Sequence, residues 1–239
     1  MSNSKLSPSL KNRLLLQLTR SDRESLLAEA RFVRLSVGQT FARSGDQITS
    51  VFFPDSGVIS LVSEMTTGHQ LAVTATGPEG AVGFGFLLGM RRYPIRLVVL
   101  VEACGYAITA ERLSLVFEQS ELLRRTTLSY VGRKLAELAR TVACSRVHSH
   151  RQRLARWLLD IADKAEARSL PLTHETLALM VGGPRHAVTV ALKELRAKGA
   201  ITHLRGRIDI VKRSVLVAQA CECYAGRPPR SVAQTVFAG

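Results

Sequence analysis

Three residues within the stretch 172–211 have a spacing that suits two closely packed helices. Ala178 is small enough to let two helices cross at short range, Gly182 suits a tight turn, and Val188 can pack between the helices. This is the pattern of a helix-turn-helix, whose second helix can lie in the major groove of DNA. The spacing therefore predicts a DNA-binding unit in this part of the chain.

The neighbouring residues supply signals that begin and end the two helices. Thr173 is a good N-cap, because its hydroxyl can accept a hydrogen bond from a backbone N–H of the first turn. The glycine pair at 182–183 ends the first helix, and Pro184 suits the first position of the second. The β-type runs at 201–204 and 207–211 then predict a two-stranded wing.

An ordinary helical hairpin is the alternative interpretation of the same stretch, since its turn would also be short and contain glycine. However, a first helix, a turn, a second helix and a wing follow one another in the required order. The formal net charge of +14 also favours a polyanionic partner. We therefore expect double-stranded DNA as a partner.

The first half of the chain has a different texture. Leucines among charged residues at 10–30 predict one or two short helices, and from Arg31 onward short β-type runs alternate with turn signals such as Pro54-Asp55-Ser56-Gly57. Several short runs at this spacing favour a compact sandwich or barrel over a parallel sheet. The expected strands lie at 31–35, 49–53, 57–63, 70–76 and 97–103.

After Glu111 the pattern becomes helical, with Gly132 as the only glycine for a long way, and we expect one long helix over 118–147. Apolar residues on it recur at alternating intervals of three and four, which is typical of a coiled-coil seam. We expect this seam to form a homodimer; the alternative is that it packs on the chain's own β domain. The seam residues are Leu128, Val131, Leu135, Leu138 and Val142.

The residues after the long helix complete the C-terminal domain. Ser149 is expected to cap the next helix, which ends near Arg168-Ser169, and Trp157 is expected in the domain's core. Beyond the wing, one more helix is expected over 214–224, followed by a loose tail at 226–239.

With these parts in this order, the chain resembles the Crp/Fnr superfamily of bacterial transcription regulators over residues 10–224. In the β region the resemblance rests on Gly45-Asp46, Phe52-Phe53 and Gly57-Val58-Ile59. It implies a homodimer that binds a near-palindromic site and acts on transcription by RNA polymerase. It also implies an α+β fold, with an antiparallel, cyclic-nucleotide-binding-like β-roll at 1–117, a dimerisation helix at 118–147 and a winged helix-turn-helix at 148–225.

By the same resemblance, the helix at 185–196 is the recognition helix. Its first exposed turns would present Arg185, His186 and Thr189 to base edges, where an arginine can make a bidentate contact with guanine. Other residues are candidates for contacts with backbone phosphates, which add affinity but little base discrimination. These are Thr173, Lys193, Arg205 and Arg207.

Superfamily members that bind cyclic nucleotides use a Gly-Glu segment for the ribose and an Arg-Ser/Thr-Ala segment for the phosphate. The corresponding stretches here read Gly80-Ala81-Val82-Gly83 and Tyr93-Pro94-Ile95-Arg96, so these functional residues are missing. We do not expect cyclic AMP, and no cofactor is evident. A pocket for another ligand is the open alternative to simple glycine turns, and its residues would be Gly80, Ala81, Val82, Gly83, Arg91, Arg92 and Arg96.

Other chemistry finds little support. The chain has no cysteine before Cys104, so it lacks the N-terminal cluster of the iron–sulfur members. Cys221 and Cys223 are two residues apart, a spacing that directs side chains to different faces of a helix, and we expect no metal site. Since no nucleophile elbow, phosphate loop or pair of carboxylates is found either, we expect no catalytic residues and no enzymatic activity.

The N-terminal residues lack the apolar core of a signal peptide, and the most apolar run, at 97–108, is too short to span a bilayer. We therefore expect a cytoplasmic protein with no membrane partner. Three functions stay open. The first is a regulator that binds DNA constitutively, and the second is a regulator gated by a ligand other than cyclic AMP. The third is a β-roll interaction module that its DNA-binding domain localises.

Overall fold

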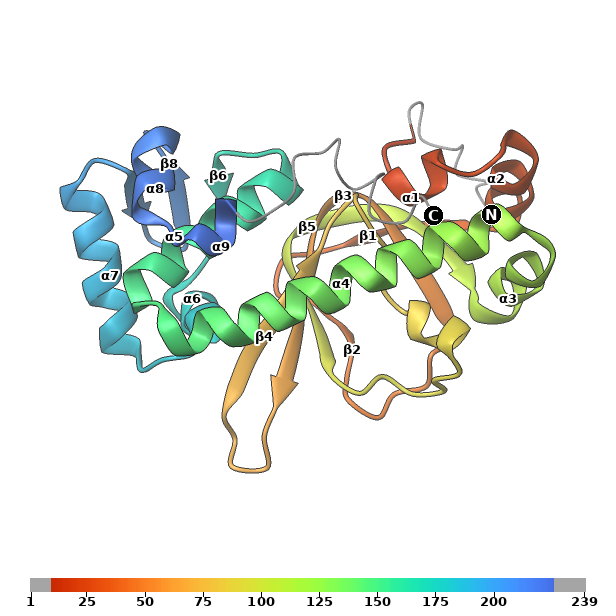
Figure 1. Ribbon diagram of the computed structural model, residues 1–239, viewed down its shortest axis with the longest axis horizontal. Helices are drawn as coiled ribbons and strands as arrows, with labels where there is room; N and C mark the ends of the chain where they lie inside the picture. Colours follow the sequence, from red (N-terminus) through yellow and green to blue (C-terminus); the bar gives the residue numbers. More distant parts are fainter. Residues whose placement is uncertain (1–9, 226–239) are drawn as a thin grey trace. The chain divides into compact units, whose positions relative to one another are not determined.

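The β-type runs between Arg31 and Thr109 form one five-stranded sheet in the computed structural model, which describes residues 10–225 (Figure 1). The strands are β1 (Arg31–Leu35), β2 (Thr40–Ala42), β3 (Ser50–Glu64), β4 (Gln70–Thr76) and β5 (Arg96–Thr109). Their order is β1-β5-β3-β4, and β2 also pairs with β5. The pairs that β5 makes with β1, β2 and β3 are all antiparallel, so the expected antiparallel sheet is confirmed.

The bounds expected for β1 and β4 are confirmed, but the turn expected at Pro54–Gly57 is wrong. The strand β3 runs through these residues without ending, because they stay paired with β5 through bulges: Pro54 lies opposite Gly105, and Ser56 opposite Cys104. Gly57 has φ +79°, and a Cβ there would collide with the backbone of Glu102. Glycine therefore serves here as a bulge residue inside a strand.

Short helices surround the sheet: α1 (Arg13–Leu16), α2 (Arg20–Leu27), the 3₁₀ helix η1 (Phe84–Leu88) and α3 (Ala110–Gln119). One or two short helices were expected at 10–30, and two are present. Asn12 fixes the first of them, since its buried side chain accepts hydrogen bonds from Leu14 N and Leu15 N. The same side chain donates to the carbonyl oxygens of Pro54 and Gly80, both at 2.8 Å.

The long helix α4 (Glu121–Val147) has 27 residues, and it begins at Glu121 rather than at residue 118 (Figure 1). Ser120 separates it from α3, because its hydroxyl accepts a hydrogen bond from Leu123 N at 3.1 Å and donates to Asp22 at 2.6 Å. The chain divides into two compact units inside this helix, between Val131 and Gly132. The unit that begins at Gly132 also includes Gln70–Thr74.

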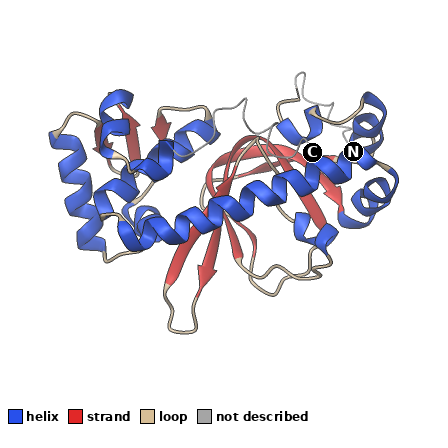
Figure 2. Cartoon of the chain, in the orientation of Figure 1, coloured by secondary structure: helices blue, strands red, loops and turns tan. Residues whose placement is uncertain are grey.

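The C-terminal unit contains helices and a small sheet of order β6-β8-β7 (Figure 2). Its elements are α5 (His150–Ala165), β6 (Ser169–Leu170), α6 (His174–Val181), α7 (Arg185–Ala197), β7 (Ile201–Leu204), β8 (Arg207–Ile210), α8 (Arg213–Gln219) and α9 (Glu222–Ala225). Ser149 caps α5 as expected, within a capping box, and Trp157 is buried.

Three expectations for this unit need correction. The helix α5 ends at Ala165, before the expected position near Arg168. The wing has a third strand, β6, which pairs with β8 through Ser169 and Leu170. The single helix expected over 214–224 is two helices, because Ala220 is extended with ψ 158°. The tail expected at 226–239 lies outside the described residues.

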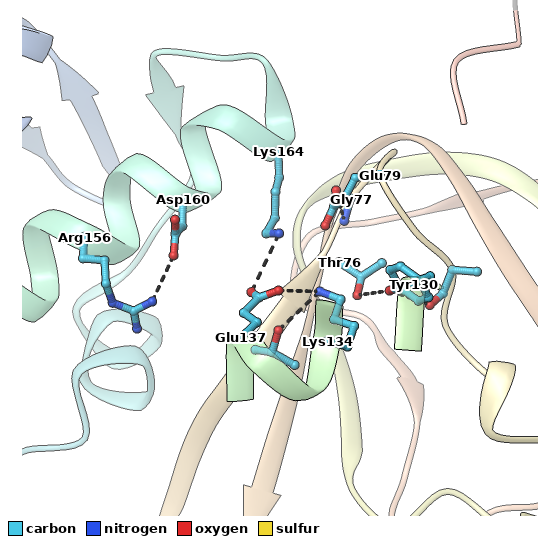
Figure 3. A network of polar contacts seen from close by, with 11 residues as sticks. Thr76, Gly77, Glu79, Tyr130, Lys134, Glu137, Arg156, Asp160 and Lys164 are labelled. Carbon is cyan, nitrogen blue, oxygen red and sulfur yellow. Dashed lines mark hydrogen bonds and ion pairs between the residues drawn. The ribbon is translucent and has the colours of Figure 1, made fainter. Parts of the chain in front are cut away.

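A buried ionic network joins α4 to α5 within the C-terminal unit (Figure 3). Glu137 on α4 pairs with Lys134 at 3.1 Å and with Lys164 of α5 at 3.8 Å. Lys134 also donates to the Thr74 hydroxyl at 3.3 Å. In the part of the chain that the structure describes, no helix is long and apolar enough to cross a membrane.

Candidate DNA-binding interface

The turn between α6 and α7 is built by the residues that the sequence singled out. Thr173 accepts a hydrogen bond from Thr176 N at 3.2 Å, so it caps α6 as expected. Gly182 ends α6 in the left-handed region with φ +63°, where a residue with a Cβ is strained. Pro184 is the N-cap of α7 rather than its first residue, which shifts the expected position by one.

Apolar residues hold the two helices against each other and against α5. The buried side chains are Leu177, Met180 and Val181 of α6, and Val188, Ala191, Leu192 and Leu195 of α7. An ion pair from Arg151 of α5 to Glu194 of α7, at 3.4 Å, adds a polar contact at the edge of this core. One face of α7 is therefore buried, and its opposite face is left for a partner.

The exposed face of α7 carries the expected base-reading residues. Arg185 and His186 are exposed in the first turn, and Thr189 is half-buried one turn later. Among residues 10–225 the Arg185 guanidinium has no hydrogen-bond or ion-pair partner, so its donors are free to bind an external acceptor. The Thr189 hydroxyl donates to the Arg185 carbonyl oxygen at 3.1 Å, which leaves its methyl group and a lone pair for a partner.

The four candidates for phosphate contacts differ in their surroundings. Lys193 and Arg205 are exposed, on α7 and at the tip of the wing. Arg207 is also exposed, but its guanidinium pairs with Asp209 at 3.1 Å, so a phosphate would compete with that carboxylate. The Thr173 hydroxyl is already used to cap α6. The anion-binding feature at this position is therefore the set of backbone N–H groups in the first turn of α6.

A histidine pair that was not expected from the sequence joins α6 to the wing. His174 begins α6 and His203 lies on β7, and their ring centroids are 4.8 Å apart. Burial lowers the pKa of His203, and the nearby His174 and Arg196 lower it further. Nothing in the local sequence signals this pair, since the two residues are far apart in the chain and meet only when the wing folds beside α6.

This pair predicts a pH-dependent stability of the winged helix. Because the pKa of His203 is lower in the folded than in the unfolded chain, the unfolded chain binds more protons as the pH falls below about 6.5. The free energy of unfolding should therefore fall between pH 7 and pH 5. Urea unfolding at several pH values measures this slope.

The variant His203→Gln should reduce the slope, because glutamine does not titrate in this range. His69→Gln is the matched control, since His69 is exposed between β3 and β4 and should leave the slope as in the original chain. A slope that His203→Gln does not change would assign the pH dependence to other groups.

The candidate pocket of the β-roll is packed with the chain's own side chains. Ala81 and Val82 are buried, and Tyr130 lies where a Cβ on Gly80 would go. The Tyr130 hydroxyl donates to the Ala81 carbonyl oxygen at 3.1 Å. A Cβ on Gly83 would likewise lie against the Ser50 carbonyl oxygen, so two of the expected pocket residues have no room beside them for a side chain.

The three arginines of the same stretch are also occupied. Arg91 stacks over the Phe86 ring at 4.8 Å, and Arg92 donates to the Gly45 carbonyl oxygen at 2.8 Å. Arg96 forms an ion pair with Glu64 at 3.1 Å. A phosphate bound here would have to displace these partners.

The expected dimerisation residues follow one face of α4. Leu128, Leu135 and Val142 are 56%, 62% and 66% exposed in the single chain, and they are spaced by seven residues. Val131 and Leu138, which fall between them, are half-buried. Large apolar side chains at heptad spacing and open to solvent are typical of a helix that packs against a partner helix.

Comparison with known proteins agrees with this geometry. The model of the Crp-like helix-turn-helix domain matches residues 152–218, which run from α5 through the wing into α8. No curated protein matches the chain. Solved structures do match, and they include the c-di-GMP-responsive global regulator CLP of Xanthomonas campestris, the CRP-family regulator TTHB099 of Thermus thermophilus and FixK2 of Bradyrhizobium japonicum.

The three structures share the fold at low sequence identity. CLP is 21% identical with a TM-score of 0.66, and the match covers 80% of this chain and 99% of that one. TTHB099 is 19% identical with a TM-score of 0.67, over 79% of this chain and 96% of the other. FixK2 is 13% identical with a TM-score of 0.68, over 80% and 98%. Residues 152–218 therefore match a Crp-like helix-turn-helix domain, and the likeness to these solved structures shows that the chain has their fold.

Proposed function

We propose that this chain is a transcription regulator of the Crp/Fnr superfamily, which binds a near-palindromic operator as a homodimer, reads bases with α7 and acts on RNA polymerase without cyclic AMP. The observation that carries the proposal is the exposed Arg185 at the start of α7, whose guanidinium has no partner among the described residues. An unpaired, exposed guanidinium beside a helix N-terminus is suited to a bidentate contact with guanine O6 and N7. His186 and Thr189 extend the same face over the next turn.

The homodimer is supported by the exposed seam of Leu128, Leu135 and Val142 on α4. Two copies joined along this helix would present two recognition helices related by a two-fold axis. Such a dimer contacts two half-sites about one helical turn, roughly 34 Å, apart, which is why we expect a near-palindrome.

Independence from cyclic AMP is supported by the β-roll. The stretch from Gly80 to Gly83 lacks the glutamate that cyclic-nucleotide binders use, and Tyr130 packs against it. Arg91, Arg92 and Arg96 all have protein partners, so none is held ready for a phosphate. CLP is a c-di-GMP-responsive regulator, but the three arginines of this stretch are engaged by protein groups among the described residues and do not favour such a ligand here.

A selection of the purified, effector-free protein against random duplex DNA tests this proposal. We expect a clean palindrome to be recovered at physiological salt. Binding that is sensitive to salt but blind to sequence would contradict the proposal, since it would mean that the free protein needs an effector before it reads bases.

The variant Arg185→Ala then tests the role of α7. Its specific affinity should fall by about 1–3 kcal/mol per half-site contact, while its affinity for random DNA should change little. Lys193→Ala, on the same helix, should instead weaken both kinds of binding together and reduce the salt dependence. Equal losses on specific and random DNA for Arg185→Ala would make Arg185 a phosphate contact.

A further inference from the structure

Three cysteines and one histidine meet at the end of α4 and the start of α9, within the C-terminal unit. They are Cys144, His148, Cys221 and Cys223, and one ligand-type atom from each lies within 4.8 Å of all the others. Cys144 and His148 face the same way because they are one helical turn apart, and His148 N still donates to Cys144 O at 3.1 Å. The other two residues reach the cluster from the C-terminal segment.

The distances within the cluster suit a tetrahedral cation site. The Sγ atoms of Cys144 and Cys221 are 3.6 Å apart, and Cys223 Sγ is 3.7 Å from His148 Nδ1. A Zn²⁺ ion with sulfur ligands at about 2.3 Å and nitrogen ligands at about 2.0 Å places neighbouring ligand atoms roughly 3.5–3.8 Å apart. A separation of 3.6 Å also leaves Cys144 and Cys221 as free cysteines rather than a disulfide.

The orientation of His148 is a second, independent indication. Its Nδ1 faces Cys223, while its Nε2 lies 3.0 Å from the Glu222 carboxylate. Histidines that bind metals regularly donate their other ring N–H to a carboxylate, which fixes the tautomer and strengthens the ligand. Glu222 therefore holds Nδ1 as the free, metal-binding nitrogen.

We propose that Cys144, His148, Cys221 and Cys223 bind one divalent cation of the zinc type. On binding, the three thiols release their protons to solvent and the imidazole binds in its neutral form. Three thiolates around a divalent cation leave one net negative charge, and the buried guanidiniums of Arg153 and Arg156 act on these sulfurs electrostatically. The cation would link the last turn of α4 to the segment at the start of α9, and so connect the first and last helices of the C-terminal unit.

A redox switch is the main alternative for such a group of cysteines. A disulfide switch needs only two cysteines. Here a third cysteine and a histidine lie with Cys144 and Cys221, and the four ligand atoms are all within 4.8 Å of one another. This number and mixture of sulfur and nitrogen atoms matches a tetrahedral cation site and argues for it over a switch of two cysteines.

The grouping of the cysteines differs from what the sequence led us to expect. Cys221 and Cys223 were expected to point to different faces of a helix, but Cys221 precedes α9, so the helical period does not apply to it. Cys144 and His148 form a Cys-x₃-His pair that could have been recognised on the long helix. Their partners lie more than seventy residues away in the chain, as the Cys144–Cys221 separation of 77 positions shows, and only the fold reveals them.

Titration of the full-length, chelator-treated protein with CoCl₂ in reducing buffer tests the proposal. We expect one Co²⁺ per chain, with the intense visible absorption of tetrahedral thiolate coordination, and loss of this absorption when ZnCl₂ is added. Protein purified without chelator should also contain about one zinc per chain by elemental analysis. The proposal is overturned if the reduced protein gives no tetrahedral Co²⁺ spectrum. It is also overturned if the protein contains a Cys144–Cys221 disulfide and binds no metal after that disulfide is reduced.

Two variants assign the ligands. Cys223→Ser should lower the zinc affinity at least about tenfold, whereas Cys104→Ser, in the other unit, should leave it unchanged. Glu222→Gln should lower the affinity by about 10–100-fold without affecting folding, because Glu222 is 79% exposed and acts only through His148. Unchanged affinity in folded Cys223→Ser protein would exclude this site. Because these measurements use no DNA, they stand or fall independently of the proposed operator binding.

Discussion

Replacement of Glu137 by glutamine is expected to lower the free energy of unfolding of the C-terminal unit by about 3–5 kcal/mol. Glu137 is the carboxylate between two lysines that are nearly buried, with Lys134 8% and Lys164 7% exposed. Glutamine keeps the size of the side chain but removes its charge. Two ammonium groups in a poorly solvated place would then lose the carboxylate that lies between them, which is costlier than the loss of a surface pair. Chemical denaturation at pH 7 measures the change.

The pH dependence of this effect has a definite sign. Burial opposes ionisation of Glu137, but Lys134 and Lys164, with hydrogen bonds from Lys134 and Thr74, outweigh it and lower the pKa to about 2. The stabilisation is therefore complete above about pH 4.5 and is lost as the pH falls toward 2. The difference between the original chain and Glu137→Gln should shrink over the same range.

The matched control is Glu24→Gln, which makes the same chemical change in an exposed i,i+4 pair with Arg20. Its effect should be much smaller, because water solvates both groups. If both variants lose the same stability, the network of Figure 3 contributes no more than a surface ion pair.

Replacement of Leu135 by glutamate is expected to convert the proposed dimer to a monomer. Leu135 is at the middle of the exposed seam on α4, and in a dimer both copies of its side chain would be buried. Loss of about 1.5–3 kcal/mol per buried leucine, counted twice, weakens association roughly 100-fold or more, and the two carboxylates add repulsion. Sedimentation at several protein concentrations measures the dissociation constant.

The control for this variant is Met65→Glu. Met65 is comparably exposed, at 54%, but it lies next to the turn between β3 and β4 rather than on α4. We expect it to stay dimeric. A Leu135→Glu protein that also stays dimeric would place the interface elsewhere. If it becomes monomeric, its affinity for the selected operator should fall, because two half-sites are then bound independently.

Elements set by local interactions were predicted well. Thr173 and Ser149 cap their helices as expected, and Gly182 takes the left-handed turn, because each of these signals acts through backbone groups a few residues away. The strands β1 and β4 have the predicted bounds for a similar reason, since β-type runs are ended by adjacent turn residues. The two helices of the helix-turn-helix and the turn between them therefore follow from local sequence signals.

Errors arose where a distant partner overrides a local signal. Pro54–Gly57 has the composition of a turn, but pairing with Gly105 and Cys104 of β5 keeps β3 extended through bulges. Ser120 ends α3 because it finds Asp22, far away in the chain, which splits a segment whose period is helical throughout. In both cases the deciding hydrogen bonds join residues that no short window contains.

The sequence by itself predicted the order of the parts: capping residues, turn glycines, apolar periodicity and net charge indicate a winged helix suited to DNA, preceded by a sheet and a long helix. Only the tertiary structure decided which polar side chains are free and which are engaged. Arg185 is unpaired among the described residues, while Arg92 and Arg96 have partners, and their residue type is the same. The grouping of Cys144 and His148 with Cys221 and Cys223 also needed the fold, because such contacts depend on how distant segments pack rather than on spacing along the chain.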